Sequence, residues 1–278
     1  MDHQTLTSLF DFSGRTAIIT GGGGVLGGAL AAALAGCHAH TVILDRDEAA
    51  ANRTAEGLRH MGRGEVWALG ADVLQPESLQ AAAEQIASRL GPADILINAA
   101  GGNHPSATTS AITSFFDLPV EALRFVTDLN LLGTMLPCQA FGRGMAARGE
   151  GSILNIASMN AVRPLTRIPA YSAAKAAVSN FTQWLAVHMA QNYSPRIRVN
   201  AIAPGFFLTE QNRYLLTEKG SGDLTERGRS ILAHTPMNRF GAPEDLCGAV
   251  LWLLSPAAAF VTGILLPIDG GFSAYSGV

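Results

Sequence analysis

The 278 residues are 48% hydrophobic and 15% charged, a balance typical of a globular chain with a large core and contrary to disorder. The net charge of −3 and the pI near 6.1 give no electrostatic case for a nucleic-acid or anionic-membrane partner. Cys37, Cys138 and Cys247 are odd in number and far apart, so free thiols in a reducing cytoplasm are expected, and no metal site.

Apolar runs rich in valine and isoleucine alternate along the chain with longer segments of helical spacing. The runs are expected to form strands at 16–20, 40–45, 65–72, 93–101, 151–158, 196–205 and 263–271. The segments between them are expected to form helices at 25–36, 47–61, 76–90, 119–147, 170–193 and 243–255. Continuous apolar strands indicate a sheet covered on both faces, and the alternation indicates parallel pairing. We therefore predict one α/β domain over residues 1–278, a doubly wound parallel sheet of about seven strands with helices on both faces.

The segment 206–242 interrupts this alternation, because it is polar, mixed and rich in arginine. It lies between the end of a strand and the next helix, so it would pass over the carboxyl ends of the strands, where such folds bind ligands. We expect it to form a lid over the substrate.

The most apolar stretch, residues 247–268, is divided by Pro256 and Gly263 into pieces too short to span a membrane. The N-terminal segment MDHQTLTSLFDFSG lacks the basic and apolar regions of a signal peptide. A cytoplasmic protein without a membrane or nucleic-acid partner is therefore expected.

Four consecutive glycines follow the first expected strand and open the first expected helix. Such a turn lets the backbone approach a pyrophosphate, and the helix N-terminus offers it unpaired N–H groups. Gly22, Gly24 and Gly27 satisfy the GxGxxG pattern. A tight turn without a ligand is the alternative, but the flanking strand and helix favour a dinucleotide site.

Asp45 ends the second expected strand, which follows the glycine loop and the first expected helix. A carboxylate there can accept both ribose hydroxyls of NAD and would repel the extra phosphate of NADP. Arg46 could bind that phosphate instead, but Asp45 would then have to turn away. NAD is therefore expected, with NADP as the alternative.

Tyr171 and Lys175 are four residues apart in an expected helix and share one of its faces. Because Lys175 and Lys219 are the only lysines, a Tyr-x-x-x-Lys pattern rarely arises here by chance. An ammonium about 4 Å from a phenol would lower the phenol's pKa from about 10 to about 7. General acid–base catalysis is efficient at that value.

Ser158 ends the strand that precedes the helix of Tyr171, where its hydroxyl could hold a substrate oxygen, and Asn130 lies in the expected helix before that strand. Local hydrogen bonds could explain each of these residues singly. Their combination with the Tyr–Lys pair favours catalysis.

These residues resemble the short-chain dehydrogenase/reductase family, in its single-domain branch, over roughly residues 12–272. The likeness is carried by TGGGGVLG from Thr20, LD at 44–45, ADV at 71–73, NAAG at 98–101, Asn130, Ser158, YSAAK from Tyr171 and PGFFLT at 204–209. It implies a Rossmann fold and hydride transfer between a nicotinamide and a CH–OH group. It also implies roles for four residues: Tyr171 as general acid/base, Ser158 orienting the substrate oxygen, Lys175 binding the nicotinamide ribose and lowering the tyrosine pKa, and Asn130 anchoring a water relay behind the lysine.

The resemblance further implies a set of cofactor contacts. They are Gly21, Gly24, Val25, Leu26, Asp45 and Arg46, then Asp72 and Val73 at the adenine, Asn98, Ala99 and Gly101 at the adenosine, Tyr171 and Lys175, and Pro204, Phe207 and Thr209 at the nicotinamide. One residue departs from the pattern, because Val25 occupies the second glycine of TGxxxGxG. This departure leaves the exact geometry of the loop open.

Polar and cationic side chains gather in three loops beside the expected site. The candidates for substrate contact are Asn103, His104, Asn160, Arg163, Arg167, Gln211 and Arg213. A steroid or acyl-chain pocket would be mostly aliphatic and aromatic, whereas arginine matches a carboxylate. Exposed surface is the alternative for each arginine or histidine alone, but the cluster favours a sugar acid.

Within the family, GGNHP, SMNA, APGFFLTEQNR and DGGFSAYSGV look like the bacterial D-mannonate oxidoreductase (fructuronate reductase) subgroup. This likeness implies reversible hydride transfer between NAD(H) and the secondary alcohol of D-mannonate or the ketone of D-fructuronate. The alternatives are another sugar-acid or polyol dehydrogenase of the gluconate type, a 3-oxoacyl-carrier-protein reductase and, in a different class, a non-catalytic dinucleotide sensor. The family resemblance also implies a homotetramer.

Overall fold

A seven-stranded sheet forms the centre of the computed structural model, which describes residues 2–208, 213, 216–218 and 222–277. All six neighbouring strand pairs are parallel, in the order β3-β2-β1-β4-β5-β6-β7. The strands are β1 (Thr16–Thr20), β2 (His40–Asp45), β3 (Val66–Gly70), β4 (Ile95–Asn98), β5 (Gly151–Ile156), β6 (Ile197–Pro204) and β7 (Leu265–Ile268). The predicted doubly wound α/β fold is confirmed.

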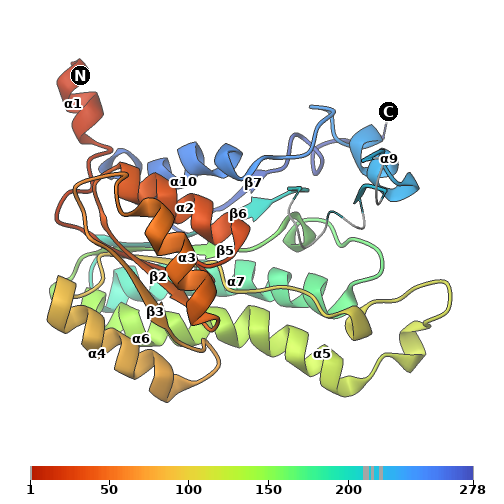
Figure 1. Ribbon diagram of the computed structural model, residues 1–278, viewed down its shortest axis with the longest axis horizontal. Coiled ribbons are helices and arrows are strands. Elements are labelled where there is room, and N and C mark those ends of the chain that lie inside the picture. The colour runs from red at the N-terminus through yellow and green to blue at the C-terminus, as the bar shows by residue number, and fades with distance from the viewer. Residues whose placement is uncertain (1, 209–212, 214–215, 219–221, 278) are drawn as a thin grey trace.

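Helices cover both faces of this sheet (Figure 1). One face carries α2 (Val25–Gly36), α3 (Glu48–Leu58) and α10 (Cys247–Leu254), and the other carries α4 (Pro76–Leu90), α6 (Gly133–Arg148) and α7 (Pro169–Asn192). Neighbouring residues of β1 enter opposite cores, Ile19 the first and Ile18 the second, and both are fully buried. Burial of each side chain contributes about 1.5–3 kcal/mol. Because both faces are buried, the strands are continuously apolar.

The shorter elements lie in the connections. They are α1 (His3–Ser8), α5 (Val120–Thr127), α9 (Glu226–Ala233), the 3₁₀ turns η1 (Pro105–Ala107), η2 (Phe115–Asp117), η4 (Met159–Ala161), η5 (Pro243–Leu246) and η6 (Pro256–Ala258), and the π-helical turn η3 (Asp128–Leu132). The single helix expected over 119–147 is therefore divided into α5, η3 and α6. The helix expected over 243–255 begins as the 3₁₀ turn η5.

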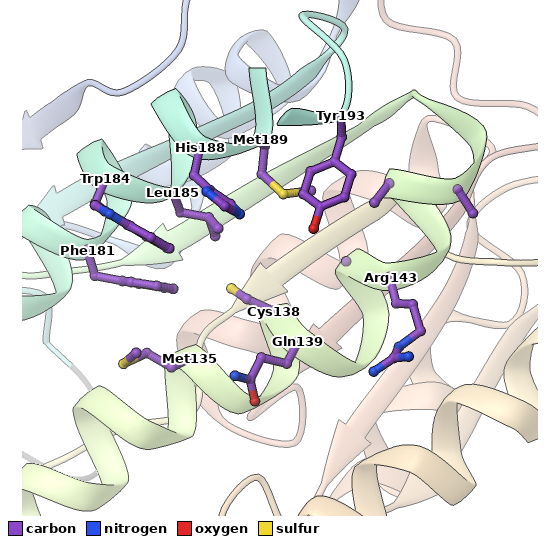
Figure 2. A pocket seen from close by; sticks show the side chains of 13 residues that line it. Met135, Cys138, Gln139, Arg143, Phe181, Trp184, Leu185, His188, Met189 and Tyr193 are labelled. Atoms are coloured by element: carbon purple, nitrogen blue, oxygen red, sulfur yellow. The ribbon is translucent and has the colours of Figure 1, made fainter. Parts of the chain in front are cut away.

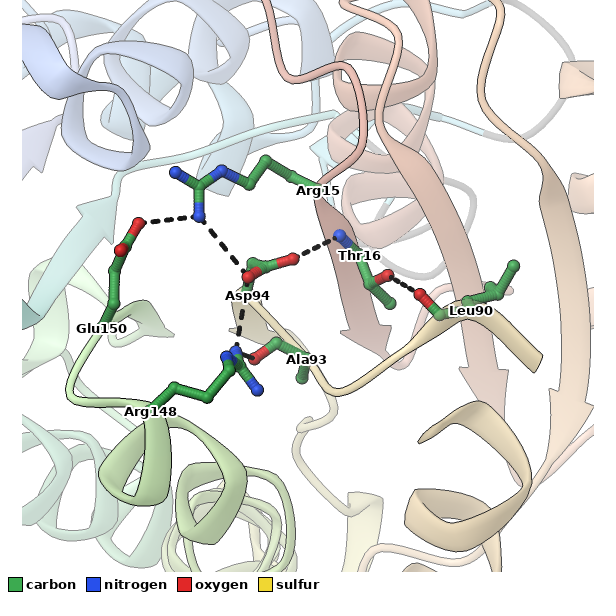
Figure 3. A network of polar contacts seen from close by, with 7 residues as sticks. All are labelled: Arg15, Thr16, Leu90, Ala93, Asp94, Arg148 and Glu150. Carbon is green, nitrogen blue, oxygen red and sulfur yellow. Dashed lines mark hydrogen bonds and ion pairs between the residues drawn. The ribbon is translucent and has the colours of Figure 1, made fainter. Parts of the chain in front are cut away.

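A polar network ties the amino ends of β1, β4 and β5 together (Figure 3). The Asp94 carboxylate accepts a hydrogen bond from the Thr16 backbone N–H at 2.8 Å and pairs with Arg148 at 3.3 Å. Arg15 joins Asp94 at 3.5 Å to Glu150 at 2.7 Å. This network lies at the amino ends of the strands, where it fixes their register. The carboxyl ends, on the opposite side of the sheet, remain available for a site.

The carboxyl ends of β1 and β4 form the switch point of the sheet, because the chain crosses to opposite sides after them. The loops that follow these two strands touch each other. Gly21 has φ +64°, and a Cβ on it would lie 2.7 Å from the Ala100 backbone nitrogen. Only glycine fits at this turn, so the first glycine of the loop is required by both conformation and space.

The segment after β6 leaves the sheet and returns to it. Phe207 forms a parallel bridge with Gly241. Between these two residues the described chain carries α9, which lies beside the C-terminus of the chain (Figure 1). α9 begins at an N-cap residue, Thr225, whose hydroxyl accepts the Gly228 N–H at 3.0 Å. Within the described ranges, none of the helices combines the length and the apolar character that crossing a bilayer requires.

Candidate functional site

A cavity of 490 Å³ lies at the carboxyl ends of the strands. Most of the residues predicted to hold the cofactor and to carry the chemistry line this one cavity. They are Gly21, Gly24, Val25, Leu26, Asp45, Arg46, Asp72, Val73, Ala99, Gly101, Ser158, Tyr171, Lys175, Pro204 and Phe207. The fold therefore brings together segments that are far apart in the sequence, from the first strand to the end of the sixth.

The glycine loop forms one wall of the cavity. Gly24 is the N-cap of α2 and supplies no side-chain hydrogen bond to it, so the first N–H groups of the helix are available to an anion. Val25 is the first residue of this helix and is 43% exposed. Its side chain therefore faces the cavity instead of the backbone of the turn, which explains how the loop accepts valine at the family's second glycine.

Asp45 forms the end of the same wall. Its carboxylate accepts the Gly23 N–H at 3.0 Å and the Asp47 N–H at 3.0 Å, which holds it against the loop. A Cβ on Gly23 would lie 3.0 Å from a carboxylate oxygen of Asp45. Arg46 is exposed beside it. The oriented Asp45 carboxylate can accept hydrogen bonds from the hydroxyls of an adenosine ribose. The uncapped N-terminus of α2 nearby can donate N–H groups to a pyrophosphate.

Tyr171, Lys175 and Ser158 meet at the opposite wall. α7 begins at Pro169, so Tyr171 lies in its first turn and Lys175 follows one turn later. Lys175 is 4% exposed, and its ammonium donates to the Ile156 carbonyl at 2.7 Å and lies 5.7 Å from the centre of the Tyr171 ring. The phenol forms a hydrogen bond with the Ser158 hydroxyl. A tyrosine O–H, a serine O–H and a cation thus face one space.

The protonation of this pair differs from the expectation. Burial raises the pKa of the Tyr171 phenol above its ordinary value, and the hydrogen bond with Ser158 lowers it only in part. Burial also lowers the pKa of Lys175 to about 8. The expected tyrosine pKa of about 7 is therefore wrong for the free protein, because desolvation of both groups outweighs an ammonium that lies more than 5 Å from the ring.

Asn130 lies in the π-helical turn η3 and is completely buried. The Asn130 amide nitrogen donates to the Gly102 carbonyl at 2.7 Å, and its amide oxygen accepts the Gly102 N–H at 3.1 Å. These two bonds hold the loop after β4 in place. A Cβ on Gly101 would lie 2.8 Å from the Asn130 amide oxygen and 3.2 Å from the Lys175 nitrogen. Asn130 and Lys175 therefore converge on Gly101, where only glycine leaves room for both.

Asn160, predicted to contact the substrate, bonds to neighbouring residues of the chain. It is 6% exposed, and its amide N–H donates to the Ser158 hydroxyl at 3.2 Å. Its amide oxygen accepts from Ser172 at 2.8 Å and from the Leu165 N–H at 3.1 Å. With these bonds made, Asn160 positions Ser158, and its contact with a substrate stays a prediction.

Several other predicted residues do not line the cavity. The Asn98 side chain is fully buried in the sheet and donates to Asn155 at 2.9 Å. Asn103 donates to Thr108 at 2.8 Å, and His104 accepts the Ser106 N–H at 3.2 Å. These last two side chains hold the loop after β4 in shape, because their polar groups bond within it.

The arginines predicted to contact the substrate lie outside the cavity lining. Arg163 is exposed and donates to the Tyr275 carbonyl at 3.4 Å, and Arg167 and Arg213 are exposed. Thr209 and Gln211 lie outside the described residues. Leu74, Leu129 and Ile156 also line the cavity and were missed, because apolar lining residues follow no sequence pattern.

A larger hollow, of 840 Å³, lies away from this chemistry, between α6 and α7. Figure 2 shows Phe181, Trp184 and His188 of α7 on one side of it and Met135 and Gln139 of α6 on the other. Its lining is mostly apolar and includes none of the predicted catalytic residues. It is therefore a surface feature of the helical layer, and the smaller cavity is the candidate active site.

The chain is similar to known proteins over most of its length. A family model described as Enoyl-(Acyl carrier protein) reductase matches residues 24–273. An uncharacterized oxidoreductase, UxuB, from Bacillus subtilis (strain 168) is 46% identical over 277 residues, which cover 96% of this chain and 98% of that protein. The 7alpha-hydroxysteroid dehydrogenase of Escherichia coli (strain K12) is 34% identical over 258 residues, which cover 93% of this chain and 94% of that protein.

A solved structure is similar throughout. It is that of a Haemophilus influenza protein provisionally described as a D-mannonate oxidoreductase, with bound NAD. The TM-score is 0.91 and the identity 45%, and the match covers 98% of this chain and 100% of that one. The glycine loop, the seven-stranded parallel sheet, the Tyr–Lys pair and these matches lead to one conclusion. The chain belongs to the short-chain dehydrogenase/reductase family.

Proposed function

We propose that this protein is an NAD(H)-dependent oxidoreductase that acts on the secondary alcohol or ketone of a sugar acid, with D-mannonate and D-fructuronate as the substrate pair. The observation that carries the proposal is that Tyr171, Ser158 and Lys175 line the same cavity as Asp45 and the glycine loop. The similar Haemophilus influenza protein, provisionally described as a D-mannonate oxidoreductase and crystallised with NAD, supports both the cofactor and the substrate.

In this proposal the glycine loop and the N-terminus of α2 hold the pyrophosphate, and Asp45 holds the adenosine ribose. Asp72 and Val73 line the cavity at the position proposed for the adenine. Lys175, held by the Ile156 carbonyl, binds the nicotinamide ribose. When bound, the nicotinamide supplies or accepts the hydride.

The remaining steps belong to the protein. Ser158, positioned by Asn160, donates a hydrogen bond to the reacting oxygen, and Tyr171 donates a proton to that oxygen in reduction or removes one in oxidation. Because burial raises the pKa of Tyr171, the phenol keeps its proton at neutral pH and is ready to act as the acid. The Lys175 ammonium stabilises the phenolate that remains after transfer, and Asn130 keeps the loop at Gly102 in place.

The segment 206–242 completes the proposed site as a lid, and Phe207 at its start lines the cavity. A location in the cytoplasm is also part of the proposal. It is supported by three free cysteines within the described chain, Cys37, Cys138 and Cys247.

A dehydrogenase screen tests the proposed function. Purified protein is assayed with NAD and NADP against hexonates and polyols, and with NADH and NADPH against hexuronates and 2-keto acids. A bile acid is included because of the relative named a hydroxysteroid dehydrogenase. The highest kcat/KM is expected for D-mannonate with NAD or D-fructuronate with NADH. Turnover of the bile acid or a polyol alone would overturn the substrate, and binding of NADH without turnover of any compound would favour a sensor.

Replacing Asp45 by alanine is expected to weaken selection for NAD. The carboxylate accepts the ribose hydroxyls and repels a 2′-phosphate, so its loss lowers kcat/KM with NAD and relieves the repulsion of NADP. The ratio of kcat/KM for NAD to that for NADP should fall by roughly 10–100-fold, the loss of a charge-assisted contact. Steady-state kinetics with both cofactors measure this ratio. Asp47→Ala, which alters the neighbouring helix cap, is the control. An unchanged ratio in Asp45→Ala would contradict the ribose contact.

We also propose a homotetramer in which the exposed face of α6 and α7 meets a second copy. Trp184, Val187 and Tyr193 are each more than half exposed on this face, and Trp184 borders the 840 Å³ hollow. In a symmetric assembly the same face of two copies meets, so the projecting rings of one copy can enter the hollow of the other. Trp184→Asp is expected to reduce the assembly to smaller species in light scattering, whereas Phe116→Asp, at a 91% exposed residue of η2, should not. An unchanged mass for Trp184→Asp would exclude this face.

A further inference from the structure

The side-chain amide of Asn160 is held in one orientation. Asn160 is a buried residue of η4, and its amide oxygen accepts the Ser172 hydroxyl at 2.8 Å and the Leu165 N–H at 3.1 Å. A backbone N–H can only donate, so the amide atom that faces Leu165 is the oxygen and the amide nitrogen faces the other way. Two donors from outside η4 therefore fix which end of the amide meets the catalytic serine.

The amide nitrogen of Asn160 faces the Ser158 hydroxyl and donates to it at 3.2 Å. The Asn160 backbone N–H donates to the same oxygen, also at 3.2 Å, because Ser158 is the N-cap of η4. A hydroxyl has two acceptor positions and one proton to donate. One residue thus fills both acceptor positions of Ser158, and the serine keeps only its own proton for a further hydrogen bond.

Ser158 can therefore act only as a donor toward the cavity, which it lines together with Tyr171. Burial raises the pKa of the Tyr171 phenol, and the hydrogen bond with Ser158 lowers it in part. This lowering is the effect of a hydroxyl that donates to the phenol oxygen. The phenol's own proton is then left for a substrate, so the two hydroxyls have different tasks.

We propose that Asn160 is a positioning residue that makes Ser158 an obligate hydrogen-bond donor to the reacting oxygen. This inference rests on the proposed function, in which Ser158 and Tyr171 engage that oxygen. In reduction the ketone oxygen accepts from both hydroxyls. In oxidation the alcohol oxygen accepts from Ser158, so the alcohol directs its own proton to Tyr171, which removes it. Were Ser158 able to accept, the alcohol could donate to it in place of Tyr171, and Asn160 excludes that arrangement.

The test replaces the amide donor by an acceptor of the same shape, in Asn160→Asp. The new carboxylate still accepts from Ser172 and Leu165, but it also accepts the Ser158 proton and withdraws it from the substrate. The kcat for D-mannonate with NAD should fall by roughly 10–100-fold, with KM changed less than about threefold, because the lost bond is strongest in the transition state. Asn52→Asp is the matched control, since the exposed Asn52 of α3 donates to a backbone carbonyl of its own helix.

A double-variant cycle separates positioning from packing. Ser158→Ala removes the hydroxyl through which Asn160 acts, so in that background Asn160→Asp should change kcat less than about threefold. Ser172→Ala leaves the amide in place but removes one of the two bonds to its oxygen. It should lower kcat by roughly 2–10-fold, again only when the Ser158 hydroxyl is present, and it decides the question if Asn160→Asp does not fold. Retained NADH binding and an unchanged Tm show that the variants are folded.

The outcomes separate this inference from the proposed function. Full activity of Asn160→Asp, or an equal loss with and without the Ser158 hydroxyl, overturns the positioning role even if the wild type oxidises D-mannonate. If the wild type acts instead on a bile acid or a polyol and the effect of Asn160→Asp still depends on Ser158, the positioning role stands and the sugar-acid assignment fails. NADH binding without turnover of any compound overturns both.

Discussion

Replacing Tyr171 by phenylalanine is expected to lower kcat in both directions by roughly 10²–10⁴-fold, the contribution typical of a positioned acid or base. The ring remains and only the hydroxyl is lost, so packing against α5 and the loop at Ala107 should persist. NADH should still bind with an affinity within a few-fold of the wild type, because the dinucleotide contacts on the glycine loop and Asp45 are untouched. Single-turnover kinetics and NADH fluorescence titration separate the two effects.

Tyr193→Phe is the matched control for this variant, since Tyr193 is an exposed tyrosine at the end of α7. It should retain full turnover. Activity of Tyr171→Phe above roughly 1% of the wild type would contradict the acid–base role. The pH dependence adds a second check. Burial raises the pKa of the phenol, so reduction, which uses the protonated form, should persist at neutral pH, whereas oxidation should increase as the pH rises.

Replacing Lys175 by arginine is expected to lower kcat/KM by at least roughly 10²-fold, the order expected when a catalytic group is misplaced. Lys175 is 4% exposed, and its nitrogen lies within 2.7 Å of the Ile156 carbonyl. The larger planar guanidinium does not fit there, because a Cβ on Gly101 would already lie 3.2 Å from the lysine nitrogen. Steady-state kinetics and NADH titration should both show the loss. Near-normal kcat/KM in the arginine variant would mean that charge alone suffices.

Lys175→Met tests the same charge through stability. Burial lowers the pKa of Lys175 from 10.5 to about 8, so between these values the unfolded chain binds more protons than the folded one. The stability of the wild type should therefore rise with pH across this window, and below pH 8 the folded protein carries the full cost of the buried charge. The methionine variant should be inactive yet more stable than the wild type by about 1–3 kcal/mol at pH 7. This difference should shrink as the pH approaches 10.5. Lower stability of Lys175→Met at pH 7 would show instead that the ammonium stabilises the fold.

The strands and the dinucleotide loop were predictable because their determinants are local. β1 and β2 begin and end at the predicted residues, since each is a short apolar run bounded by turn residues. The placement of Tyr171 and Lys175 on one wall followed from a spacing of four in a helix. Such features depend on backbone geometry within a few residues, which the sequence alone specifies.

Other features depended on contacts between distant segments. The π-helical turn at Asn130 accompanies the bonds between its amide and Gly102, and periodicity within 119–147 contains no sign of that contact. Asn160 supports Ser158 through its amide N–H, because Ser172 and the Leu165 N–H bond its amide oxygen and fix the amide. In both cases the partner, and not the residue itself, decides what the side chain does.

The amino-acid sequence by itself determined the family, the parallel α/β sheet and most of the residues that line the cavity at the switch point. Only the tertiary structure decided the direction of the Tyr171 and Lys175 pKa shifts and the bonds between Asn130 and the loop at Gly102. The physical reason is the range of the interactions. Side-chain spacing along one element is local, whereas desolvation and contacts between distant segments depend on how densely separate elements pack around a point.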